Sequence, residues 1–160
     1  MARSGAARRQ QVSDAVARLQ DQWGDGLPVA SDPHGLATLV VRLLDAGESC
    51  RPADVALAVR ALCEHFGALR GGRTVELRVP PYAAVQLAAD GDAGPSHTRG
   101  TPPNVVETDA ATFLRLAVGS LDWDDAVARH LVRTSGVHAD LGTMFLLFRR
   151  SRDSRDGRSS

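Results

Sequence analysis

Lysine and isoleucine are absent from the 160-residue sequence, and Asn104 is the only asparagine. These three amino acids have AT-rich codons, whereas the abundant alanine, arginine, glycine and valine have GC-rich codons. The pattern is typical of a bacterial genome with a high GC content. Because codon usage explains why all 19 basic residues are arginine, we discount the arginine excess as a sign of function.

The chain also lacks net charge and long apolar runs. It carries 19 acidic and 19 basic residues, so no overall field favours nucleic acid or a membrane surface as partner. No stretch approaches the roughly 18 consecutive apolar residues that a membrane-spanning helix needs. The arginine-containing start of the chain has no apolar segment of a secretory signal behind it. We therefore expect a cytoplasmic protein with no integral membrane span and no nucleic-acid partner.

Cysteine is scarce, and the common catalytic patterns are missing. Cys50 and Cys63 match no C-x-x-C redox or zinc spacing, and we expect Cys63 to be a buried apolar residue of a helix. The histidines form no H-x-x-H or H-E-x-x-H pattern, and neither G-x-S-x-G nor a phosphate-binding glycine motif occurs. We therefore predict no cofactor, no metal site and no catalytic residue, and we expect binding rather than catalysis.

Helical patterns occupy the first part of the chain. Apolar residues recur at helical spacing over residues 10–22, 36–46 and 52–66. Pro52 falls in the first turn of the third pattern, where proline is favoured, and Gly67 is the predicted end of that helix. The sequence therefore begins with three predicted helices.

The period then changes to that of strands. Residues 73–79 alternate polar and apolar side chains, which is typical of a half-buried strand. Residues 82–87 predict a second strand antiparallel to the first, and residues 105–107 a short third one. Residues 131–135 and 137–139 predict the last strand or strands, with a kink at the glycine between them.

Three further helices are predicted among and after these strands. Thr108 or Asp109 caps the first of them, and Asp122 caps the second. Asp140 caps a final apolar helix over residues 141–148. An acidic cluster in this region suits acid–base work or a hard cation, but capping accounts for these carboxylates without either.

The order of elements from residue 105 onward is distinctive. A strand is followed by a capped helix with an F-L-x-L core at 113–116, a second short helix, an S-G step at 135–136 and an apolar last helix. This order resembles the C-terminal half of the sterol carrier protein type 2 family. The sequence V-P-P at 79–81 and H-T-R-G-T-P-P-N at 97–104 is similar to the actinobacterial branch, the bacterial sterol carrier orthologues.

The resemblance implies an α+β fold in which helices cover a five-stranded, mostly antiparallel sheet, with extra helices at the N-terminus. We accordingly expect an N-terminal helical extension over residues 1–48 and a sterol-carrier-like domain over 49–148. Residues 149–160 contain no apolar side chain, and we expect a disordered basic tail there.

The family implies an apolar tunnel between the sheet and the helices. Mapped onto this sequence, the lining consists of Phe113, Leu116, Trp123, Val127, Met144, Phe145 and Phe148. In the polar loop, His97, Arg99 and Asn104 are candidate ligands for an anionic headgroup, through charge-assisted hydrogen bonds. The alternative is a loop whose polar groups satisfy its own backbone.

Three functions remain open at this stage. The first is non-catalytic binding or transfer of a lipid, a sterol or another apolar or amphipathic small molecule. The second is the accessory domain of an enzyme that resembles the mycothiol-dependent isomerases. The third is an interaction module with a filled core, since periodicity does not distinguish a filled interior from a hollow one. No sequence feature indicates an oligomeric state.

Overall fold

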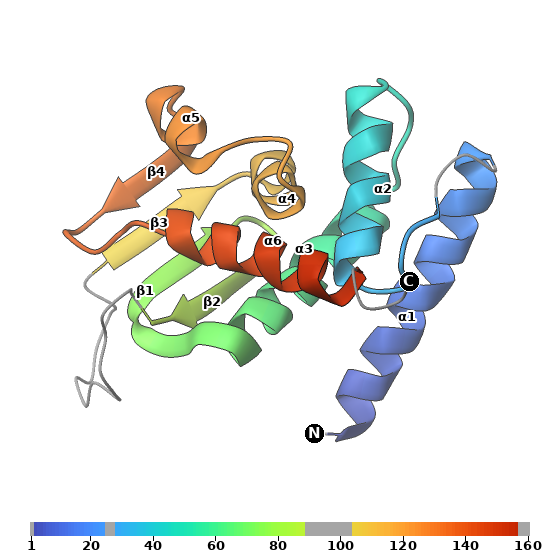
Figure 1. The fold of residues 1–160 in the computed structure, drawn as a ribbon, viewed down its shortest axis with the longest axis horizontal. Helices are drawn as coiled ribbons and strands as arrows, with labels where there is room; N and C mark the ends of the chain where they lie inside the picture. The colour runs from blue at the N-terminus through green and yellow to red at the C-terminus, as the bar shows by residue number, and fades with distance from the viewer. Residues whose placement is uncertain (1, 25–27, 89–103, 157–160) are drawn as a thin grey trace.

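The computed structural model describes residues 2–24, 28–88 and 104–156 (Figure 1). The elements in these residues are α1 (Ala2–Trp23), α2 (Pro33–Asp45), α3 (Pro52–Arg70), β1 (Gly71–Val79), β2 (Ala83–Leu87), β3 (Asn104–Thr108), α4 (Ala110–Val118), α5 (Trp123–Ala128), β4 (Val132–Ser135) and α6 (Gly142–Asp156). In Figure 1 the strands lie on one side of the molecule, α1 and α2 lie on the other, and α6 runs between the two groups. No helix within the described residues is both long and apolar enough to cross a membrane.

The sheet confirms the predicted α+β class but has fewer strands than predicted. Its order is β2-β1-β3-β4, with antiparallel pairs at both edges and a parallel β1–β3 pair in the middle. The five-stranded prediction is wrong for the described residues, because residues 137–139 form no strand. Gly136 adopts a φ of 99°, which turns the chain away from the ladder, and Val137 is 93% exposed.

The predicted aspartates before α4 and α6 accept hydrogen bonds from the helix starts, whereas the predicted cap Asp122 before α5 makes no such side-chain hydrogen bond. The Asp109 side chain accepts a hydrogen bond from the Thr112 N–H at 2.9 Å and caps α4. Before α6, Asp140 accepts from the Gly142 N–H at 2.8 Å. Asp32 caps α2 in the same way and therefore fixes where that helix begins.

Two helices extend beyond their predicted ends. Helix α3 passes through Gly67 and ends at Arg70, so a glycine alone did not stop it. Helix α6 continues to Asp156, and the prediction of a disordered tail is wrong up to that residue. The polar composition of this segment suggested disorder, but Arg152 forms an ion pair at 2.8 Å with Asp32, which lies far away in the sequence.

A single hydrophobic core joins the N-terminal helices to the sheet domain. Apolar side chains of α1 and α2 belong to the same buried cluster as those of α3, α4, α6 and the strands. Ion pairs reinforce these contacts. Arg18 of α1 donates two hydrogen bonds to the buried carboxylate of Asp54 in α3, at 2.7 and 3.0 Å, and Arg115 of α4 pairs with Asp45 of α2 at 2.7 Å. The helices α1 and α2 are therefore packed against the sheet domain and are not joined to it through the chain alone.

Candidate ligand-binding groove

Aromatic side chains fill the space where the sequence suggested a tunnel. Phe66 of α3 is fully buried, and its ring centroid lies 5.9 Å from Phe113, 5.6 Å from Phe145 and 4.9 Å from Phe148. All three contacts are edge-to-face, an arrangement that aromatic rings favour. The structure thus brings three predicted lining residues together around Phe66, which lies at the end of the helical pattern over residues 52–66 and was not predicted to line the site.

The other predicted lining residues surround this cluster to different degrees. Trp123 stacks on Phe145 with a centroid distance of 6.1 Å, and Leu116 is 1% exposed. Met144 is buried, with 8% of its surface exposed. Val127 is 37% exposed on α5, so it does not share the buried environment of the others.

An apolar groove lies at the surface between α3 and α6. It has a volume of about 300 Å³ and is lined by His65, Phe66, Leu69, Arg70, Met144, Leu147, Phe148 and Ser151. Its floor is formed by buried side chains, whereas Leu69 is 51% and Leu147 is 45% exposed at its rim. Of the predicted residues, only Met144 and Phe148 line this groove. Leu69 and Leu147 were missed because periodicity does not show which two helices lie side by side.

Phe148 occupies a central position in this groove. Its ring centroid lies 5.4 Å from that of His65 in α3 and 5.9 Å from that of His34 in α2. Only 3% of Phe148 is exposed. The Phe148 side chain of α6 therefore packs between α2 and α3 in the floor of the groove.

The predicted polar loop contributes one described residue. Asn104 is 2% exposed, donates to the Thr74 carbonyl at 2.9 Å and accepts from the His138 N–H at 3.0 Å. Its amide thus joins the start of β3 to β1 and to the turn after β4. His97 and Arg99 lie outside the described residues.

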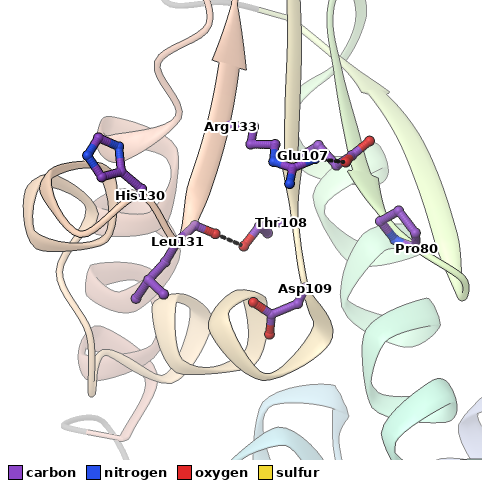
Figure 2. A pocket seen from close by; sticks show the side chains of 7 residues that line it. All are labelled: Pro80, Glu107, Thr108, Asp109, His130, Leu131 and Arg133. Carbon is purple, nitrogen blue, oxygen red and sulfur yellow. Dashed lines mark hydrogen bonds and ion pairs between the residues drawn. The ribbon is translucent and has the colours of Figure 1, made fainter.

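A second, more polar hollow lies at the end of β3 (Figure 2). It has a volume of about 330 Å³ and is lined by Pro80, Glu107, Thr108, Asp109, His130, Leu131 and Arg133. Arg133 lies 3.7 Å from Glu107, and the Thr108 hydroxyl donates to the Leu131 carbonyl. Figure 2 shows the His130 ring pointing away from both carboxylates, so the three do not form an acid–base set.

His130 holds a left-handed backbone conformation that favours glycine, with a φ of 56°. It follows α5, where its N–H donates to the Val127 carbonyl and the next N–H to the Ala126 carbonyl. We expect His130→Gly to raise the free energy of unfolding by about 1 kcal/mol, because glycine adopts this conformation without the Cβ clash. Urea denaturation measures the gain. His130→Ala is the control, and an equal gain in that variant would contradict this explanation.

The cysteines do not add a reactive group to either hollow. Cys63 is buried, as predicted, and burial raises the pKa of its thiol to about 12, with a smaller contribution from Glu64. Burial also raises the pKa of Cys50. Both thiols are therefore protonated at neutral pH. Among the residues that the structure describes, no three His, Cys, Asp or Glu side chains gather closely enough to hold a metal ion.

The fold and the groove define the class of this protein: an α+β domain in which helices cover an open mixed sheet and an apolar groove separates two of them. A family model described as bacterial SCP ortholog matches residues 51–147, and the chain belongs to this family. The match confirms the sterol carrier family indicated by the sequence motifs. It begins at α3 and ends within α6. A search of curated proteins found no match.

Proposed function

We propose that this protein is a non-catalytic carrier domain that binds an apolar or amphipathic small molecule in the groove between α3 and α6. The observation that carries the proposal is the apolar groove itself, with two half-exposed leucines at its rim. The family supports the same function, because sterol carrier proteins are named for the lipids they bind. The protein then needs neither a cofactor nor a catalytic residue.

The groove suits a flexible apolar chain. Its volume of about 300 Å³ lies at the lower end of the range of small-molecule pockets. A ligand that covers Leu69 and Leu147 gains about 25 cal/mol for each Å² of apolar surface removed from water. The unbranched Met144 side chain lets the wall adapt to different ligands. Arg70 lies at the rim, where a guanidinium suits an anionic headgroup.

Charge at the rim should weaken binding. We expect Leu69→Asp and Leu147→Asp each to raise the dissociation constant of cis-parinaric acid, a fluorescent fatty acid, about tenfold or more. Each variant loses the burial of the exposed half of one leucine, worth about 1 kcal/mol, and adds a carboxylate that repels the anionic probe. A fluorescence titration of the purified full chain measures the effect.

Val137→Asp is the matched control, because Val137 is 93% exposed and lies outside the groove. This variant should bind the probe as the wild type does. All three leucine and valine positions are exposed enough for the variants to fold. If the wild type shows no saturable binding, or if all three variants bind alike, the proposal is wrong.

The packed aromatic cluster favours a second candidate, an interaction module with a filled core. In that case the groove would receive an apolar side chain of another protein, and lipids would leave the melting temperature unchanged. A ligand that binds only the folded state raises that temperature by mass action. A melting-temperature rise with fatty acids therefore favours the carrier over the interaction module.

A further inference from the structure

The position of α6 sets the capacity of the groove. Its floor consists of Phe66, Met144 and Phe148, and each of these side chains is at most 8% exposed. Phe145 of the same helix lies behind them against Phe66. A ligand that penetrates below this floor therefore displaces Phe148, which the second half of α6 carries.

The second half of α6 is attached to the start of α2. The Arg152 guanidinium donates to the Asp32 carboxylate at 2.8 Å, and only 20% of the Arg152 and 37% of the Asp32 side chain is exposed. The other Asp32 oxygen accepts from the Gly35 N–H at 2.8 Å. Because α2 is anchored in the core, this carboxylate is a fixed point for the end of α6. Figure 1 shows that end of α6 beside α2.

Two further contacts hold α6 against neighbouring parts of the chain. The Phe148 ring rests against His34, two residues after Asp32, with a centroid distance of 5.9 Å. Arg149 lies 3.6 Å from Asp122 before α5 and ties the middle of α6 to another element. The pKa of Asp32 also reflects the contact, since burial alone raises it but the hydrogen bonds from Gly35 and Arg152 outweigh burial and lower it.

The residues that form this attachment lie outside the part of the chain that defines the family. Asp32 and His34 precede residues 51–147, and Phe148 and Arg152 follow them. A segment before the matched residues and a segment after them therefore contact each other. Neither segment alone accounts for the contact.

We propose that α2 holds the second half of α6 in place at the apolar groove through the Arg152–Asp32 ion pair, and we call this contact the latch. The latch keeps the Phe148 side chain in the floor of the groove. Releasing the latch frees the second half of α6 and admits the ligand beneath it. The role of the latch in ligand exchange rests on the proposed function, whereas its effect on α6 does not.

Amide hydrogen exchange of the full chain tests the latch. We expect Arg152→Glu to accelerate exchange of the α6 amides between Phe145 and Arg152 about three- to tenfold, because repulsion from Asp32 replaces a partly buried attraction. The β1 amides report global unfolding and serve as the internal reference. Asp32→Asn in the Arg152→Glu background should reduce the acceleration but not abolish it, since asparagine removes the repulsion and still caps α2 but restores no ion pair.

Arg129→Glu is the matched control, with the same change of charge at an exposed arginine outside α6. Equal acceleration of the α6 amides in both glutamate variants would overturn the latch. An acceleration of the α6 amides no greater than that of the β1 amides would also overturn it, because global unfolding would then explain both. Stopped-flow release of cis-parinaric acid should become faster in Arg152→Glu by a similar factor. An unchanged release rate contradicts gating, whereas a wild type that binds no probe contradicts the proposed function and leaves the exchange test intact.

Discussion

Replacing Phe66 by alanine is expected to lower the free energy of unfolding by about 3–5 kcal/mol, the largest effect of any single substitution considered for this protein. Phe66 is fully buried, and its ring meets those of Phe113, Phe145 and Phe148 edge to face. The substitution removes apolar surface and leaves a cavity that three other rings line. Those rings belong to α4 and α6, so the loss reaches beyond α3.

Chemical denaturation with an unchanged m-value measures the loss. Phe66→Leu keeps most of the volume, and we expect it to cost less than about 1.5 kcal/mol. Leu69→Ala is the control on the same helix, where a half-exposed side chain loses much less on truncation. A Phe66→Ala loss no greater than that of Leu69→Ala would mean that the interior is loosely packed, which the edge-to-face contacts contradict.

Asn104→Ala is expected to lower the free energy of unfolding by about 2–3 kcal/mol. The substitution leaves the Thr74 carbonyl and the His138 N–H without their partner, and an orphaned polar group costs about 1–3 kcal/mol where water does not replace the bond. His138 is exposed, so water partly replaces the second bond, and the estimate stays below the sum of two full penalties.

Asn104→Asp distinguishes this explanation from a simple loss of volume. Aspartate still accepts from the His138 N–H, but it cannot donate to the Thr74 carbonyl and it places a charge at a position that is 2% exposed. We therefore expect Asn104→Asp to be at least as destabilising as Asn104→Ala. Thermal unfolding compares the two variants. Wild-type stability in both would rule out a structural role for this amide.

The elements that local chemistry specifies were predictable. The alternation over residues 73–79 corresponds to β1, and Asp109 caps α4 through a hydrogen bond to a residue three positions on. The alternating pattern wrongly predicted a strand at Val137. The left-handed glycine before it turns the chain away from the sheet, so this residue pairs with no neighbouring strand. Periodicity and capping depend on residues that are close in the sequence, so they predict only the structure that such local interactions determine.

The groove and the length of α6 depend on contacts between distant residues. Met144 was predicted as a lining residue, but Leu69 faces the same groove from a helix far earlier in the chain. Arg152 belongs to a polar segment whose helical structure is accompanied by an ion pair with Asp32, 120 positions away. Composition predicts disorder in such a segment because it contains no sign of its partner.

The most direct test of the account is the place where an amphiphile binds. A methyl-detected NMR titration of the full chain with decanoate follows Leu69, Met144 and Leu147 in the groove and Leu131 in the polar hollow of Figure 2. The account predicts saturable shift changes at the three groove residues and none at Leu131. Saturable changes centred on Leu131, or no saturable change at all, would contradict it.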